Sequence, residues 1–214
     1  MNSKNLKLYF VMGSADVQGD PVALLDRVLQ LGISCFQWRE KGPRALKGED
    51  YFRFAKLCQQ LCRRFQVPFI VNDDVELALE LQAEGIHIGV TDAPLALVKS
   101  KVPSSMWVGY SVNAAQDLEV ALQVGANYVG VGPIFPTTSK ADAAPPLGLK
   151  ELARLRRLAP TLPMVAIGGI DETNFKKVLH CGVEGAAFIS AICKYPSFVT
   201  RYLKYYNSMP DNFC

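Results

Sequence analysis

Short apolar segments alternate with amphipathic segments along the whole chain. The apolar segments are rich in Val, Ile, Phe and Tyr, which strands favour. Most are apolar at nearly every position, which is typical of strands covered by helices on one side and packed inside on the other. We therefore predict strands at Lys7–Val11, Cys35–Arg39, Pro68–Asn72, Gly85–Gly89, Trp107–Ser111, Tyr128–Gly132, Met164–Gly168 and Ala186–Ser190.

The segments between these strands carry apolar residues at helical spacing. The first of them also has clear end signals, with Asp20 as a capping residue, Pro21 in the first turn and Gly32 after the last turn. We predict helices at Pro21–Leu31, Asp50–Arg64, Val75–Ala83, Ala114–Val124, Leu149–Leu158, Asp171–Cys181 and Pro196–Tyr206.

This alternation of strands and helices predicts parallel βαβ units. Eight units favour an α/β fold of the single (β/α)₈ TIM-barrel type. A doubly wound open sheet is the main alternative, but no Gly-x-Gly-x-x-Gly follows the first strand. We expect one domain over residues 1–214, with the barrel at about 6–206 and a frayed tail at 207–214.

Composition narrows the class of protein. The net charge of +3 is small, and Lys and Arg are scattered, so we expect no nucleic-acid partner. Arg154, Arg156 and Arg157 form the densest basic group, which we interpret as a solvated helix face. No apolar run reaches the ~18 residues of a membrane span, and the first residues lack a secretion signal. We therefore expect a cytoplasmic protein without a membrane partner.

Six cysteines are present, and no two of them form a Cys-x-x-Cys pair. Zinc binding is therefore disfavoured, and reduced thiols in a reducing compartment are the expected state.

The second predicted strand ends in an unusual polar pattern. Side chains alternate between the two faces of a strand, so Gln37, Arg39 and Lys41 point one way while Phe36 and Trp38 pack under helices. Two cations brought together at the barrel mouth favour an anion, because their repulsion is costly at low dielectric. A phosphate or diphosphate fits this requirement. The alternative is a chance grouping of charges at a solvated strand end.

Carboxylates follow the third and fourth strands. Asp73 and Asp92 lie at neighbouring strand ends and together suit Mg²⁺, which is commonly held by one or two carboxylates plus phosphate oxygens. The alternative is that these aspartates cap the helices that follow. We interpret Asp74 as such a cap and Asp73 as the better ligand.

The later strands end in small and hydroxyl-bearing residues. The sixth strand opens into Thr137, Thr138, Ser139 and Lys140, a donor-rich loop that suits phosphate oxygens. The seventh and eighth strands end at Gly168-Gly169 and Ile189-Ser190, where barrels of this type often bind phosphate. Ser111 adds a hydroxyl at the end of the fifth strand.

Neither histidine is assigned to catalysis. His87 lies within a predicted strand and is expected to be a core histidine with its hydrogen bonds satisfied, and His180 closes a helix. No pairing of a nucleophile with a base is evident, so covalent catalysis is disfavoured.

Taken together, these motifs resemble the thiamine-phosphate synthase family from Lys7 to about Tyr202. The strongest pieces are the motif from Gln37 to Lys41, Val71-Asn72-Asp73, and the segment Tyr128–Gly148. The resemblance implies a Mg²⁺-dependent transferase that joins a pyrimidine diphosphate to a plain or carboxylated thiazole phosphate. Thiamine phosphate and diphosphate are the products. The two small-molecule substrates are the implied partners.

The resemblance also implies residue roles. Gln37 is expected to bind the pyrimidine, and Asp73 and Asp92 to bind Mg²⁺. The implied diphosphate-binding residues are Arg39, Lys41, Asn72, Ser111 and Lys140, and of these Arg39, Lys41, Ser111 and Lys140 are the expected catalytic residues. The implied thiazole-phosphate residues are Thr137, Ser139, Gly169, Ile189 and Ser190. Trp38, Glu40 and Thr138 lie inside the same motifs and complete the expected substrate-binding set.

One position departs from the family pattern. Val90 stands where many members carry Gln, two residues before Asp92, which bears on hydrogen bonding near the metal. Two alternatives stay open from the sequence, a relative resembling a thiazole tautomerase and a non-catalytic sensor of phosphate ligands. Assembly into a homo-oligomer also stays open.

Overall fold

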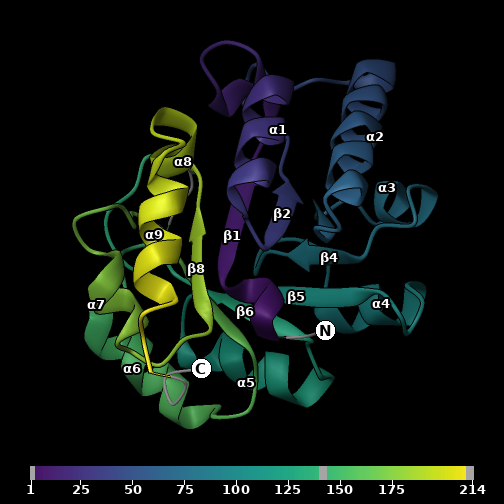
Figure 1. Ribbon diagram of the computed structural model, residues 1–214. Helices are drawn as coiled ribbons and strands as arrows, with labels where there is room; N and C mark the ends of the chain where they lie inside the picture. Colours follow the sequence, from purple (N-terminus) through teal and green to yellow (C-terminus); the bar gives the residue numbers. More distant parts are fainter. Residues whose placement is uncertain (1–2, 140–143, 211–214) are drawn as a thin grey trace.

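A computed structural model of the chain describes residues 3–139 and 144–210. Eight parallel strands form a closed barrel in the order β1 to β8, and β8 pairs with β1. Helices surround the barrel (Figure 1), which confirms the predicted TIM barrel. The strands are β1 (Leu8–Met12), β2 (Cys35–Trp38), β3 (Phe69–Asn72), β4 (Gly85–Ile88), β5 (Trp107–Val112), β6 (Tyr128–Val131), β7 (Met164–Ile167) and β8 (Gly185–Phe188).

The helices follow the strands in turn. They are α1 (Pro21–Leu31), α2 (Gly48–Arg64), α3 (Val75–Glu80), α4 (Leu95–Lys101), α5 (Ala115–Val124), α6 (Gly148–Leu158), α7 (Phe175–Leu179), α8 (Ser190–Lys194) and α9 (Phe198–Tyr206), with short 3₁₀ turns η1 (Ser3–Leu6) and η2 (Ser14–Asp16). The end signals of α1 are confirmed, because the Asp20 carboxylate accepts from two amides of the first turn and Gly32 is left-handed with a φ of 98°.

Four elements show the clearest differences from the sequence prediction. Helices α4 and α8, of seven and five residues, were not predicted from the sequence. The predicted eighth strand ended at Ser190, but that residue begins α8. Helix α7 begins at Phe175 rather than Asp171, because the Asp171 carboxylate accepts hydrogen bonds from the amide and hydroxyl of Thr173 and so forms a turn first.

Side-chain alternation divides the interior into two cores. In β1, Phe10 and Met12 face outward into the layer between barrel and helices, whereas Tyr9 and Val11 face into the barrel. The inner core consists of Leu6, Tyr9, Val11, Cys35, Ile70, Tyr128, Val165 and Ala187. Leu6 comes from η1 and is fully buried, so it closes the N-terminal end of the barrel. The C-terminal end is the one at which barrels of this type form their sites.

The basic group on α6 is not a uniform solvated face, as the sequence suggested. Arg154 is partly exposed and pairs with Glu151. Arg156 is only 9% exposed and lies 3.2 Å from the Glu184 carboxylate, which also accepts from the amide of Met164. This prediction was wrong for Arg156, because its guanidinium joins α6 to the start of β8.

The first residues of the predicted tail are hydrogen-bonded. The amides of Asn207, Ser208 and Met209 continue the hydrogen bonding of α9, so fraying does not start at residue 207. Residues 211–214 lie outside the described part of the chain. Cys35, Cys58, Cys62, Cys181 and Cys193 are free thiols, as predicted. In the ranges 3–139 and 144–210, no helix has both the length and the apolar character needed to cross a membrane.

Candidate active site

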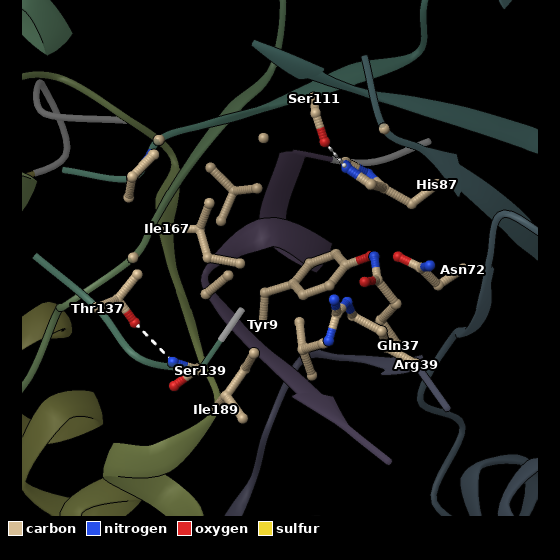
Figure 2. Close-up of a pocket in the computed structure, with 18 of the residues that line it drawn as sticks. Tyr9, Gln37, Arg39, Asn72, His87, Ser111, Thr137, Ser139, Ile167 and Ile189 are labelled. Carbon is tan, nitrogen blue, oxygen red and sulfur yellow. Dashed lines mark hydrogen bonds between the residues drawn. The ribbon is translucent and has the colours of Figure 1, made fainter. Parts of the chain in front are cut away.

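A cavity of about 260 Å³ lies where the strands end on their C-terminal side. Figure 2 shows that its walls carry two chemically different groups of side chains. Gln37, Arg39 and Asn72 lie on one side, and Thr137, Ser139 and Ile189 lie on the other. The position agrees with the rule that barrels of this type gather their chemistry at this end.

The alternation predicted for the second strand is correct. Gln37, Arg39 and Lys41 all line the cavity, whereas Phe36 and Trp38 are buried against the helices. The Arg39 side chain makes no hydrogen bond or ion pair within the described residues. Its guanidinium is therefore available to an anion that enters the cavity.

Two carboxylates meet beside these cations. The Gly89 amide donates to Asp92 Oδ2 at 3.0 Å and to Asp73 Oδ1 at 3.3 Å, so one N–H holds both groups together. Lys41 forms an ion pair with Asp73, and its Nζ lies 3.6 Å from Asp92 Oδ1. Asn72 also donates to Asp73 Oδ2, at 2.6 Å.

This crowding changes the acidity of Asp92. Partial burial raises the pKa of its carboxyl group, and the neighbouring Asp73 carboxylate raises it further, while Lys41 opposes both effects. Asp73 has a left-handed backbone with a φ of 63°, which is uncommon outside glycine and turns its side chain toward Asp92. The pair is therefore a cation-attracting group held together by backbone geometry.

Asp74 has the capping role that the sequence predicted. Its carboxylate accepts from the Leu77 amide at 2.9 Å and so caps α3. The Tyr51 hydroxyl donates to the same group at 3.2 Å. Adjacent aspartates thus have separate functions, one at the helix and the other in the cavity.

The opposite wall comes from the ends of β6, β7 and β8. Thr137, Ser139, Gly169, Ile189 and Ser190 all line the cavity there. The Ser139 amide donates to Thr137 Oγ1 at 3.2 Å, which folds this loop into a compact turn. At Gly169 the φ is 63°, and a Cβ would collide with the backbone of the β6 loop. A glycine is therefore required for the two loops to approach so closely.

Two residues of the predicted substrate-binding set need separate comment, Lys140 and Thr138. Lys140 lies outside the described residues, so its predicted role stays a prediction. Thr138 lines a second, more open hollow that shares Thr137 and Ser139 with the main cavity. Because Thr138 is not among the described residues that line the main cavity, we correct the expectation that it does so.

Trp38 also requires correction as a substrate-binding residue. It is 1% exposed and packs against Phe54 of α2, with ring centroids 5.1 Å apart. The strand alternation that brings Gln37 and Arg39 into the cavity places Trp38 on the opposite face. Trp38 thus lies in the motif from Gln37 to Lys41 because it packs β2 against α2.

Glu40 braces the loops around the site. Its carboxylate accepts from the amide and hydroxyl of Ser14, each at 2.7 Å, and from the Leu46 amide at 2.9 Å. It does not line the cavity with its neighbours Arg39 and Lys41. The expectation of direct substrate contact is therefore replaced by a positioning role for the loop that carries Lys41.

Replacing Glu40 by Ala is expected to destabilise the protein by roughly 2 kcal/mol, because three donors lose a charged acceptor. The KM for the substrate whose anion binds at Arg39 and Lys41 should rise as well, because the loop carrying Lys41 is no longer held in place. Thermal unfolding and steady-state kinetics test both effects. Glu49→Ala, an exposed position at the start of α2, is the matched control and should change stability by less than about 0.5 kcal/mol. If Glu40→Ala and Glu49→Ala showed the same stability and the same KM, Glu40 would have no bracing role.

The floor of the cavity contains residues that sequence analysis did not assign to the site. Tyr9, His87 and Tyr128 all line it. His87 is hydrogen-bonded through both ring nitrogens, as expected, but it faces the cavity instead of a closed core. Strand alternation puts His87 on the same face as Gly89, and that signal could have identified it.

The fold and site together define the class of protein. This is a TIM-barrel protein with one cavity that combines cations, a carboxylate pair and hydroxyl-rich loops, as suits substrates bearing phosphate groups.

Comparison with known proteins identifies the family. The family model described as thiamine monophosphate synthase matches residues 8–192. A thiamine-phosphate synthase of Lysinibacillus sphaericus is 48% identical over 195 residues, covering 91% of each chain. One from Anoxybacillus flavithermus is 46% identical, covering 91% of this chain and 89% of that one. A solved structure titled thiamine phosphate pyrophosphorylase, from Pyrococcus furiosus, superposes with a TM-score of 0.85 at 29% identity, covering 96% and 97% of the two chains.

The chain therefore belongs to the thiamine-phosphate synthase family, and its activity is that of a transferase in thiamine biosynthesis. These relatives lend no support to the tautomerase-like alternative or the sensor alternative.

Proposed function

We propose that the cavity binds a pyrimidine diphosphate and a thiazole phosphate together and joins them into thiamine phosphate, with diphosphate as the second product. The observation that carries this proposal is the division of one cavity into a wall of cations and carboxylates and a facing wall of hydroxyls and glycine. Each wall suits one phosphorylated substrate. The reacting carbon and nitrogen would then meet between the walls.

The diphosphate belongs on the side of β2 to β5. Arg39 makes no hydrogen bond or ion pair with the described side chains, and its planar guanidinium suits phosphate oxygens. Lys41, Asn72 and Ser111 line the same side. We also assign Lys140 to this group, from the family resemblance alone. The Gln37 amide lies deeper, 5% exposed, where it would bind the pyrimidine.

Asp73 and Asp92 are the residues that would hold Mg²⁺. The fit rests on their convergence on one shared amide and on the Lys41 ammonium, which marks a position attractive to cations. Within the described residues no group of three or more acidic, His or Cys side chains could form a complete cage. Two carboxylates plus diphosphate oxygens and water match the usual ligands of Mg²⁺. The bound ion would neutralise charge on the departing diphosphate.

The thiazole phosphate belongs on the side of β6 to β8. The hydroxyls of Thr137, Ser139 and Ser190 are candidate donors to its oxygens, and Gly169 allows close approach of the backbone. Ile189 lines the same wall and would exclude water from the thiazole ring. Binding here would fix the thiazole nitrogen toward the pyrimidine.

The chemistry needs no strong base from the protein. The bond between the pyrimidine methylene carbon and the diphosphate oxygen breaks, the electron pair leaves with diphosphate, and the aminopyrimidine delocalises the cation. The thiazole nitrogen then donates its lone pair to that carbon. Arg39 and Lys41 would stabilise the leaving group, and the two walls would align the reactants.

A coupled assay tests this proposal. The purified protein would receive the pyrimidine diphosphate, the thiazole phosphate and Mg²⁺, and thiamine phosphate would be followed by the fluorescence of its oxidised form. We expect product only when all three are present. Binding of both substrates without any product would contradict the proposal and favour the sensor alternative.

A further inference from the structure

Five side chains from five strands form a continuous hydrogen-bonded chain across the cavity floor. It starts at Gln37, whose Nε2 donates to the Tyr9 hydroxyl at 3.0 Å. The Tyr9 and Tyr128 hydroxyls are 2.8 Å apart. Tyr128 then contacts His87 Nδ1 at 3.2 Å, and His87 Nε2 lies 3.1 Å from Ser111 Oγ. The last of these contacts is visible in Figure 2.

The two phenols in the middle keep their protons. Tyr9 is 1% exposed and Tyr128 is fully buried. Burial raises the pKa of both hydroxyl groups well above their ordinary value, so neither ionises at neutral pH. Each therefore has one proton to donate and needs an acceptor, because an unpaired buried hydroxyl costs free energy.

The Gln37 amide sets the direction of donation. An NH₂ group only donates, so Tyr9 accepts from Gln37 and passes its own proton to Tyr128. In the reverse order, the Tyr9 proton would turn to the sulfur of Cys35 among the described residues, and sulfur is a weak acceptor. Because the Tyr128 oxygen accepts from Tyr9, we infer that its own proton goes to His87 Nδ1, 3.2 Å away.

The direction of hydrogen-bond donation then determines which nitrogen of His87 carries a proton and where the Ser111 hydroxyl points. A ring nitrogen that accepts carries no proton, so His87 is neutral with its proton on Nε2. That N–H donates to Ser111 Oγ, which leaves the Ser111 hydroxyl proton free to point into the cavity. At the other end, the carbonyl oxygen of Gln37 accepts no hydrogen bond within the described residues.

We propose that Tyr9, Tyr128 and His87 are positioning residues that polarise the two ends of this chain, presenting an acceptor at Gln37 and a donor at Ser111. The inference rests on the proposed function, in which Gln37 binds the amino-bearing pyrimidine and Ser111 binds the diphosphate. A single substrate that carries a donor at one end and an anion at the other would match both ends. The chain would therefore select the orientation of the pyrimidine diphosphate before the metal and the second substrate act.

The His87 tautomer provides a test that does not depend on activity. The protein has two histidines, so a sample labelled with ¹⁵N-histidine gives two sets of ring signals. The variant His180→Asn removes one set and so assigns both. We expect His87 to be neutral with its proton on Nε2 at neutral pH. In Tyr128→Phe, loss of the donor to Nδ1 should shift His87 toward the other tautomer. A wild-type proton on Nδ1, or a Tyr128→Phe spectrum identical to wild type, would overturn the proposal.

Tyr51→Phe is the matched control for this spectrum. It removes one tyrosine hydroxyl that donates to Asp74 and takes no part in the hydrogen-bonded chain from Gln37 to Ser111. Its His87 signals should therefore match those of wild type. A change as large as that of Tyr128→Phe would mean that the spectrum reports general disturbance, and the proposal would be withdrawn.

Kinetics then test the consequence for binding. In Tyr128→Phe, the KM for the pyrimidine diphosphate should rise about 3- to 10-fold, while the KM for the thiazole phosphate stays within about twofold. Unchanged values for both would contradict the proposal. If wild-type protein makes no product, the proposed function fails, but the tautomer test still decides the polarity of the chain.

A second variant covers the case in which Tyr128→Phe does not fold. His87→Asn keeps a side-chain oxygen near the Tyr128 hydroxyl but loses the donor to Ser111. Inhibition by inorganic diphosphate should weaken by about threefold or more, because Ser111 is no longer held as a donor. Unchanged inhibition would overturn the role of the chain at the Ser111 end.

Discussion

Replacing Asp92 by Asn is expected to lower kcat/KM by about a hundredfold or more, equivalent to roughly 3 kcal/mol of transition-state stabilisation. The Mg²⁺ concentration needed for half-maximal rate should rise in parallel. The reason is that two carboxylates of the described residues converge on the Gly89 amide, so losing one would halve the negative charge that they offer to the ion. Steady-state rates over a Mg²⁺ titration, and direct calorimetric titration of Mg²⁺ with inorganic diphosphate, measure the effect.

Asp74→Asn is the control for this prediction. The substitution is the same, and the residue directly follows the other proposed ligand, Asp73. However, the Asp74 carboxylate caps α3, and Asn is an equally good capping residue, so stability and Mg²⁺ dependence should both stay close to wild type. If Asp92→Asn and Asp74→Asn gave the same Mg²⁺ titration, the assignment of the metal site would be lost.

Replacing Trp38 by Ala is expected to destabilise the protein by about 3 to 5 kcal/mol, the usual cost of removing a large buried aromatic side chain. For a chain of this length, that corresponds to a fall in Tm of about 10 °C. Trp38 is one of the largest fully buried side chains, and it packs against both Phe54 and Tyr51. Thermal or urea unfolding measures the loss.

Trp38→Phe separates packing from substrate contact. The phenyl ring keeps most of the contact with Phe54, and the variant loses the indole N–H, which is a buried donor without a partner among the described residues. Its stability should therefore lie much closer to wild type, and its KM for both substrates should be unchanged. A large rise in either KM with normal stability would restore Trp38 as a substrate-binding residue.

The predictions that held depended on local patterns. The ends of α1 followed from Asp20, Pro21 and Gly32, because capping is decided within one helical turn. The direction of Gln37, Arg39 and Lys41 followed from strand alternation, which any extended segment obeys. The same rule put Trp38 outside the cavity, and the motif in which it lies had suggested otherwise.

The predictions that failed needed knowledge of distant neighbours. Glu40 is a brace because Ser14, from η2, and Leu46, from the far end of its own loop, both approach its carboxylate. Arg156 is buried because Glu184, 28 residues further on, lies beside it in the fold. Neither partner is visible from the residues flanking the charged side chain.

The sequence by itself determined the barrel, the order of its strands and the face on which each strand presents its polar residues, because these depend on periodicity and short-range capping. Only the tertiary structure decided which groups meet: the shared Gly89 amide between Asp73 and Asp92, and the chain from Gln37 to Ser111. The physical reason is that hydrogen bonds and charge interactions act over a few ångströms. Closure of the barrel brings the five strands that carry the hydrogen-bonded residues, β1, β2, β4, β5 and β6, within that distance. Positions along the sequence do not reveal this proximity.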